Sequence, residues 1–295
     1  MHEPVLLQSV IAGLDLTPSL TVLDATTGGG GHSEAIAQAI PEGHLIAIDR
    51  DAKAVARVRE RLAAVSGKHS FEVANFRDLE AVLDRLGVTA IDRALFDLGF
   101  SSDQLVGSGR GFSFQTDEPL LMTYEAEGTG RTAADLLAQL PERELVEMFQ
   151  TYGEEEFSQV VAKAIVARRR ASPIVTTGAL VEVIRSAVPA WYKSPKRRRH
   201  FATKIFQALR IATNDEYGAI VAGLAAAWGR LAPEGRLAVI AFHSGEARLV
   251  KNFFRDLAAN DEGEILTRHA IKPTFTEVKN NPRARSATLR IIKKL

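Results

Sequence analysis

Short apolar runs alternate with amphipathic stretches over the first third of the chain. Strands that alternate with helices in this way form parallel sheets with right-handed crossovers. The first third of the chain therefore predicts an α/β domain. Strands are predicted near 21–24, 44–48, 70–73 and 92–96, and helices over Ser33–Ile40, Ala52–Val65 and Arg77–Leu86.

The alternation stops after the fourth predicted strand. Residues 103–130 hold many glycines and polar side chains and predict a long loop, a length that is usually functional or disordered. From Thr132 to about Ile211 the pattern is helical, without a convincing strand. This stretch predicts an all-helical subdomain.

The α/β pattern resumes in the last third. Asn214 can cap a helix over 215–231, and a turn at 232–235 leads into a strand at 236–242. The simplest interpretation is a sheet domain of residues 1–102 and 210–295 with an insertion over 103–209. Two consecutive domains are the alternative, but the strand at 236–242 would then lack a sheet. The remaining predicted elements are a helix over Gly245–Leu257 and strands near 264–268 and 287–292, which can pair as an antiparallel hairpin.

The amino-acid composition limits the classes of protein to which this chain can belong. The chain has 295 residues, 46% hydrophobic and 25% charged, which is typical of globular proteins. The net charge of +1 excludes a global basic field, so any nucleic-acid surface must be local. Cysteine is absent, which excludes disulfides and thiolate chemistry and agrees with the cytoplasm. With no signal peptide and no run of about 18 apolar residues, we expect no membrane contact. The seven scattered histidines predict no metal site.

Four consecutive glycines, Gly28–Gly31, join the first predicted strand to the next helix. Glycine allows a sharp bend and the close approach of a ligand. Ser33 can cap the helix that follows. A strand, a glycine turn and a helix start form the nucleotide-binding corner of an open α/β sheet.

Two acids indicate which nucleotide this corner binds. The dinucleotide fingerprint is not met, because Ser33 or Glu34 stands where its last glycine or alanine belongs. Asp24 ends the first strand, and Asp49 ends the second, where it can accept both ribose hydroxyls. This arrangement resembles S-adenosylmethionine (SAM) methyltransferases, whose cofactor carries an ammonium and a sulfonium that favour nearby acids.

Further polar residues follow the strands that share this edge. Asp97 ends the fourth strand and is the candidate catalytic residue, with the cap of a turn as its alternative role. Amino-group methyltransferases often have Asp/Asn-Pro-Pro-aromatic here, and Asp97-Leu-Gly-Phe100 matches it in part. His243 and Ser244 follow the strand at 236–242, where they can line the pocket or cap the next helix. A neighbouring His and Ser do not form a catalytic triad without the base geometry and an acid partner.

Basic and aromatic residues suggest contact with RNA. Arg110, Phe112 and Phe114 share a glycine-flanked loop and suit a phosphate and stacked bases. Anchoring of the loop by both phenylalanines is the commoner role for such residues. Residues 193–199 carry five positive charges beside Trp191 and Tyr192, which predicts phosphate contact. Arg283 and Arg285 can add to that surface, whereas Arg168–Arg170 fit a solvated helix face.

Several motifs together resemble one family, the bacterial 16S rRNA cytosine-N4 methyltransferases (RsmH, also called MraW). Jointly they are highly specific, and they follow one another in order along essentially the whole chain. The motifs are His2–Leu7, Gly28–Ser33, Asp97–Leu105, Arg110–Phe114, Phe206–Ile211, Ala241–Ser244 and Asn281–Ser286.

The resemblance implies a class I SAM-methyltransferase fold (Rossmann-like) with an inserted helical domain. It implies N4-methylation of a cytidine in the decoding region of 16S rRNA, within the small ribosomal subunit and without DNA; a homo-oligomer is left open. By motif position, the cofactor contacts are Gly30, Gly31, His32, Asp49, Phe76 against the adenine, Asp97 and Gln104. The candidate substrate contacts are Arg110, Phe112, Phe114, Lys196, Arg197, Arg198, Arg199, His243, Ser244, Arg283 and Arg285.

The chain departs from the family pattern mainly in the substrate loops. Leu121 and Thr123 replace an acid and a base, and Gly245 and Ala247 replace a leucine and an aspartate. A divergent paralogue acting on another RNA site is therefore the first alternative. A nicotinamide-dependent oxidoreductase, a non-catalytic RNA-binding factor and a methyltransferase for protein or small molecules are weaker ones.

Overall fold

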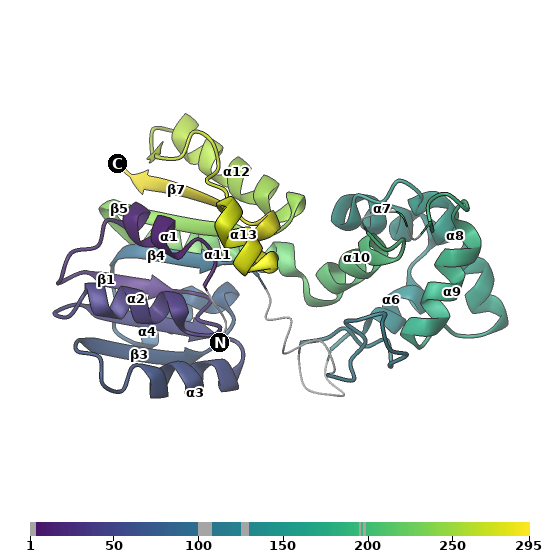
Figure 1. Ribbon diagram of the computed structural model, residues 1–295, viewed down its shortest axis with the longest axis horizontal. Helices are drawn as coiled ribbons and strands as arrows, with labels where there is room; N and C mark the ends of the chain where they lie inside the picture. The colour runs from purple at the N-terminus through teal and green to yellow at the C-terminus, as the bar shows by residue number, and fades with distance from the viewer. Residues whose placement is uncertain (1–3, 100–107, 125–129, 195, 197–198) are drawn as a thin grey trace. The chain divides into compact units, whose positions relative to one another are not determined.

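The computed structural model describes residues 4–99, 108–124, 130–194, 196 and 199–295. The chain divides into two compact units (Figure 1). The first, here the sheet unit, combines Met1–Phe100 with Tyr217–Leu295, and the second, here the helical unit, spans Ser101–Glu216. The boundaries predicted from the sequence were 102/103 and 209/210. No described helix is long and apolar enough to cross a membrane.

A seven-stranded sheet in the order β3-β2-β1-β4-β5-β7-β6 organises the sheet unit. The first five strands are parallel, and β7 is antiparallel to both β5 and β6. The order reverses between β1 and β4, and ligands of open α/β sheets bind at such a switch point. The strands are β1 (Thr21–Asp24), β2 (His44–Asp49), β3 (Lys68–Val73), β4 (Ile91–Asp97), β5 (Leu231–Ala241), β6 (Gly263–Ile265) and β7 (Thr288–Lys294).

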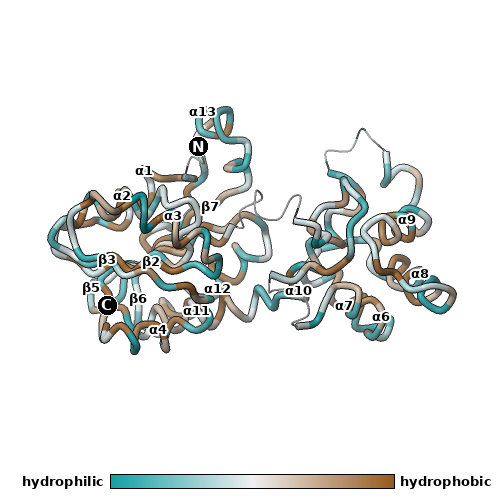
Figure 2. The backbone as a smooth tube through the Cα atoms, turned by 90° about the horizontal axis from the view of Figure 1, so that it is seen from below, coloured by the Kyte–Doolittle hydropathy of each residue, from teal (hydrophilic) through white to brown (hydrophobic). Residues whose placement is uncertain are grey.

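Helices cover both faces of this sheet, because strand side chains alternate between two apolar cores. Val22 and Leu45 pack beneath α1, α2 and α3, whereas Leu23 and Ile46 pack with α4, α11 and α12 on the other face (Figure 2). The helices are α1 (Leu7–Leu14), α2 (Gly31–Ala39), α3 (Ala52–Arg61), α4 (Leu79–Arg85), α11 (Glu216–Arg230), α12 (Ser244–Ala259) and α13 (Phe275–Asn280), with 3₁₀ turns η1 (Phe76–Asp78) and η2 (Pro282–Ser286).

Two predicted helix caps are wrong. Helix α2 already begins at Gly31, with Gly30 as its N-cap, so the buried Ser33 lies inside the helix and its hydroxyl donates to Asp24 Oδ2 at 2.6 Å. Asn214 is the last residue of α10 (Thr203–Asn214), and its amide donates to the carbonyls of Met122 and Arg210. Both side chains therefore fasten neighbouring segments instead of starting a helix.

In the described part of the helical unit, four more helices join α10. Their core contains Phe149, Ile165, Leu180 and Leu209, all fully buried. The described residues of this unit form no strand, only one isolated bridge between Pro119 and Thr176. These helices are α6 (Ala133–Gln139), α7 (Glu142–Gly153), α8 (Ser158–Ala171) and α9 (Thr177–Ala187).

Candidate functional site

Three aspartates end neighbouring strands at the carboxyl edge of the sheet. Asp24 closes β1, Asp49 closes β2 and Asp97 closes β4. In the register, Asp24 pairs with Ala47 of β2 and Leu95 of β4, so Asp49 and Asp97 each lie two residues beyond the level of Asp24 on the strands that flank it. The predicted convergence of these acids on one edge is thus present in the structure.

The glycine turn between β1 and α2 is shaped by its backbone. Gly28 and Gly30 have φ of +48° and +81°, where other L residues are strained. A Cβ on Gly30 would lie 2.7 Å from Val58 Cγ2, and a Cβ on Gly31 would lie 2.8 Å from Pro4 Cγ. Close packing against the protein's own side chains therefore requires these two glycines. Gly28 is open, since its Cβ would meet only the Thr26 carbonyl oxygen at 3.8 Å.

Asp49 fastens this turn to the second strand. Its Oδ2 accepts from the Gly28 amide at 2.8 Å, and its Oδ1 accepts from the Asp51 amide at 2.9 Å. Burial raises the pKa of this carboxyl, and the two amides oppose that rise. A carboxylate accepts about four hydrogen bonds, so two amides leave capacity for a diol.

Asp24 lies deeper, with no exposed surface. Its carboxyl accepts from the Ser33 hydroxyl at 2.6 Å and from the Thr26 amide at 3.2 Å. Burial is the main cause that raises its pKa to about 6. The Asp97 amide in turn donates a hydrogen bond of 2.6 Å to the Thr26 hydroxyl. This hydrogen bond links the ends of β1 and β4. The roles of Thr26 and Ser33 in this network were not predicted from the sequence, although the two residues flank the four glycines Gly28–Gly31.

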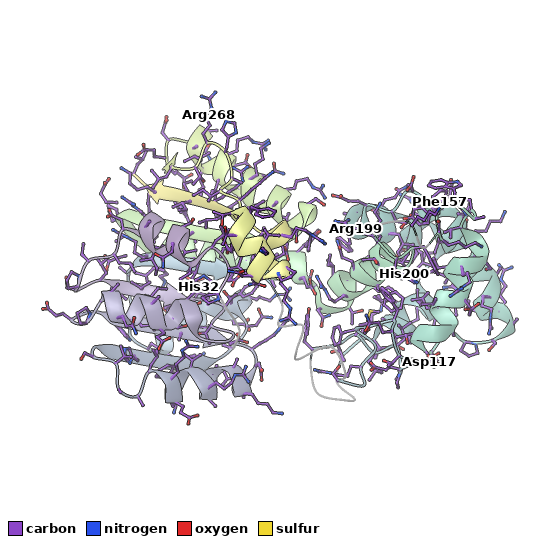
Figure 3. The ribbon with its side chains drawn as sticks, in the orientation of Figure 1. His32, Asp117, Phe157, Arg199, His200 and Arg268 are labelled. Carbon is purple, nitrogen blue, oxygen red and sulfur yellow. The ribbon has the colours of Figure 1, made fainter. Side chains whose placement is uncertain are left out.

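Asp97 occupies the switch point of the sheet beside His32 (labelled in Figure 3). Its Oδ2 lies 3.6 Å from His32 Nδ1, and its side chain is 20% exposed. Burial, then the charges of Asp24 and Glu246, raise the pKa of Asp97 to about 7. Its Oδ1 is buried and has no hydrogen-bond partner among the described residues. Such an unsatisfied acceptor is costly and is typical of a ligand site.

Aromatic rings border the same edge. Phe76 follows β3 and packs edge-on against Phe96, with ring centroids 5.6 Å apart. A Cβ on Gly99 would lie 2.7 Å from the Phe242 ring, so β4 and β5 stay in close contact beyond their last residues. The Phe76 and Phe242 rings are partly buried, so each keeps some apolar surface exposed.

His243 caps α12, which is one of its two predicted roles. Its Nδ1 accepts from the Glu246 amide at 3.4 Å. The buried Glu246 completes the capping box, because its Oε2 accepts from the amides of Phe242 and His243 at 2.8 and 3.2 Å. Ser244 is the first residue of the helix. Glu246 was not predicted as a site residue, yet it lies close enough to influence Asp97.

In the helical unit, the aromatic residues of the loop are anchors. The Phe112 ring stacks on Tyr124 at 5.3 Å, and the Phe114 ring stacks on His200 at 4.5 Å. The Arg110 guanidinium donates to the carbonyls of Thr123 and Tyr124, both at 3.2 Å. These intramolecular contacts are the ones expected of an anchored loop.

The predicted basic residues are distributed over both units. Lys196 and Arg199 are exposed in the helical unit, and Arg283 and Arg285 are exposed on η2 of the sheet unit. Gln104, Arg197 and Arg198 lie outside the described residues. In the Arg168–Arg170 run, Arg169 donates to the carbonyls of Leu137 and Leu140 and so closes α6. Within the described ranges, no cluster of His, Cys, Asp or Glu has the form of a metal site.

Comparison with known proteins assigns the chain to a family. The model of the MraW methylase family matches residues 1–295. The chain belongs to this family. It is 44% identical to the ribosomal RNA small subunit methyltransferase H of Dictyoglomus thermophilum, over 99% of this chain and 96% of that one. It is 42% identical to the protein of the same name from Heliobacterium mobile, over 100% and 99%.

A solved rRNA methylase from Streptococcus thermophilus is 11% identical, covers 100% of this chain and 99% of its own, and has a TM-score of 0.46. The family match confirms the resemblance noted in the motifs. The mixed α/β sheet with its switch point has the class I methyltransferase architecture that was predicted. Family membership also supports SAM as the cofactor.

Proposed function

We propose that this protein transfers a methyl group from SAM to the exocyclic N4 of a cytidine in the decoding region of 16S rRNA. The curated relatives carry the name of a small-subunit rRNA methyltransferase along nearly the whole chain. The single structural observation that carries the proposal is the buried, unsatisfied Oδ1 of Asp97 at the switch point. An acidic edge with one acceptor unsatisfied suits a cofactor that carries two positive charges.

The edge residues fit SAM part by part. Asp49 would accept the ribose hydroxyls, since its carboxylate has acceptor capacity beyond the Gly28 and Asp51 amides. Gly30, Gly31 and His32 would border the cofactor where α2 begins. Phe76 would lie against the adenine, and Asp97, with Gln104 by motif, would hold the amino-acid portion.

The chemistry requires position more than covalent help. The cofactor supplies an electrophilic methyl group on a sulfonium, whose carbon–sulfur bond breaks as the nitrogen–carbon bond forms. The N4 lone pair of cytosine is delocalised, so the protein must hold N4 in line with that methyl. An acceptor must also take an N4 proton as positive charge develops. Asp97 would serve, with the Leu98 or Gly99 carbonyl as second acceptor, because a pKa of about 7 suits general-base work near neutral pH.

RNA binding is proposed for the exposed cations of both units. Lys196–Arg199 would contact the phosphate backbone, and Arg283 and Arg285 would add contacts from η2. In the helical unit, Arg110, Phe112 and Phe114 would shape a loop that contacts the RNA. In the sheet unit, His243 and Ser244 would line the pocket for the cytidine at the end of β5. A cytidine outside its stack is the form that proteins read best.

Labelled methyl transfer tests this proposal directly. Purified protein and labelled SAM would be incubated with small subunits from a strain that lacks the modification, and also with naked 16S rRNA. Mass mapping should find N4-methylcytidine at one decoding-region position. A label elsewhere in the rRNA would support the paralogue alternative, which the departures at Leu121 and Thr123 motivate. No label on either substrate would reject a methyltransferase that acts on small-subunit rRNA.

A further inference from the structure

One large aromatic side chain of the helical unit stands outside the core. Trp191 is 57% exposed, whereas Trp228, the other of the two tryptophans in the chain, is 6% exposed in the sheet unit. An exposed indole carries a large apolar area into water. Neither the fold of the helical unit nor the methyl-transfer chemistry explains that exposure.

The side chains that pack against the Trp191 indole are themselves held in place. Phe157 and Tyr192 pack against it edge-to-face, each with its ring centroid 5.7 Å from that of Trp191. The buried Glu155 holds both neighbours: it accepts from the Tyr192 hydroxyl at 2.8 Å and from the Phe157 amide at 2.9 Å. Figure 3 labels Phe157 in the helical unit. A ring fixed in this way loses little conformational entropy when a ligand stacks on it.

The surroundings of Trp191 are positively charged. Residues 185–204 contain no aspartate or glutamate and seven basic residues, namely Arg185, Lys193, Lys196, Arg197, Arg198, Arg199 and Lys204. Lys193 Nζ donates to the Arg185 carbonyl, and Lys204 Nζ donates to the carbonyl of Glu154, next to Glu155. Cations therefore lie at the turn of Trp191, whereas the helix junction against which it packs carries Glu154, the buried Glu155 and Glu156 beside Lys204. This charge favours a polyanion over an apolar protein surface.

We propose that Trp191 is a stacking platform for an unpaired base of the RNA substrate, with Lys193, Lys196 and Arg199 contacting the flanking phosphates. This inference rests on the proposed function, and it assigns to the helical unit a contact with a base other than the reacting cytidine. The platform reads no sequence, because every base presents a π face. It selects single-stranded over paired RNA, since only an unpaired base can leave its stack.

Intrinsic fluorescence offers a direct test, because the chain has only two tryptophans. In the W228F variant, Trp191 is the sole tryptophan, and excitation at the red edge of the indole band avoids emission from the four tyrosines. An unlabelled single-stranded RNA of roughly 12 nucleotides should quench its emission, and an RNA duplex of equal length should quench it far less. A matched abasic strand of the same length should bind without quenching. Equal quenching by all three ligands, or none by the single strand while it binds, would overturn the platform.

Substitutions separate stacking from apolar contact. W191A should lower the affinity for the single strand by about 5-fold to 100-fold, and W191F should retain most of it. W191L keeps apolar bulk without a π face and should behave as W191A. V160A, at an exposed apolar residue on α8, is the control and should bind as wild type. Full affinity in W191L, or equal losses in W191L and V160A, would contradict stacking.

The two proposals fail in different ways. Wild-type protein that methylates rRNA while W191A binds RNA normally would reject the platform and leave the proposed function intact. Wild-type protein that binds the single strand with quenching but transfers no methyl group would reject the proposed function. Unfolding of W191A monitored by circular dichroism checks that any loss of affinity reflects the contact.

Discussion

His32 Nδ1 lies 3.6 Å from Asp97 Oδ2, while His32 Nε2 lies 3.0 Å from the Val5 carbonyl oxygen. A carbonyl only accepts, so the neutral ring carries its proton on Nε2 and turns a lone pair toward Asp97. The start of α2 and the end of β4 thus face one another through this pair, at a separation longer than a hydrogen bond. This pair sits where the proposed cofactor and the reacting nitrogen would come together.

We expect Asp97→Asn to impair both cofactor binding and turnover. The amide cannot accept a proton and carries no charge to attract the cofactor cation. The KM for SAM should rise, and kcat at saturating SAM and RNA should fall by about 100-fold or more, the usual contribution of a general base. Steady-state kinetics with labelled SAM measure both parameters. A normal kcat with a raised KM would restrict Asp97 to cofactor binding.

The raised pKa of Asp97 predicts how stability depends on pH. Its pKa is 3.8 in a model peptide and about 7 in the fold. The unfolded chain therefore ionises this group first, and the free energy of unfolding falls as pH rises through that range. Asp97→Asn lacks this contribution. Between about pH 5 and pH 8 its free energy of unfolding should therefore fall by on the order of 2 kcal/mol less than that of the wild type. Urea unfolding without cofactor measures it, with the exposed Asp256→Asn as control; equal pH profiles would refute the burial effect.

Gly30→Ala should destabilise the glycine turn through two named causes. A φ of +81° strains alanine, and the new Cβ would lie 2.7 Å from Val58 Cγ2. We expect a loss of about 1–3 kcal/mol in the free energy of unfolding. The double variant Gly30→Ala, Val58→Ala removes the clash and should lose less than the sum of the two single variants. Additive losses in a double-mutant cycle would show that the contact is not the cause.

Neutral residues in place of Lys196–Arg199 should weaken RNA binding and flatten its salt dependence. Each phosphate contact that is lost lowers the slope of log K against log salt by about 0.7 for a single strand. Arg170→Gln, at an exposed position on the last turn of α8, is the matched control and should leave the slope unchanged. Binding isotherms at several salt concentrations give the slopes. A variant slope equal to wild type would exclude phosphate contact by this segment.

The sequence predicted the parallel strands well because their signal is local. Buried runs such as Leu45–Ile48 are apolar on both faces, and an aspartate ends each of β1, β2 and β4. The acids therefore indicated the edge of the sheet that is proposed as the cofactor site. The antiparallel pairing of β6 and β7 is also confirmed, although α13 and η2 lie between these strands and they do not form a tight hairpin.

Other features depend on contacts between distant residues, which local patterns do not reveal. Ser33 matches a helix cap, yet it serves the buried Asp24 because the helix starts earlier, at Gly31. Helix α1 escaped prediction, and its last turn is held by Arg93 and Arg236, which donate to the carbonyls of Leu14 and Gly13. Strand β5 begins at Leu231, before the predicted turn, with a register shift against β4.

Isothermal titration calorimetry of the purified chain with SAM tests most directly whether the carboxyl edge is a cofactor site. We predict one SAM bound per chain, an affinity at least about 10-fold lower in Asp49→Ala because a charge-assisted contact to the ribose is lost, and no heat with NAD. The Asp256→Asn control should match wild type. Absence of SAM binding to the folded wild-type chain, or unchanged affinity in both Asp49→Ala and Asp97→Asn, would contradict a site at this edge.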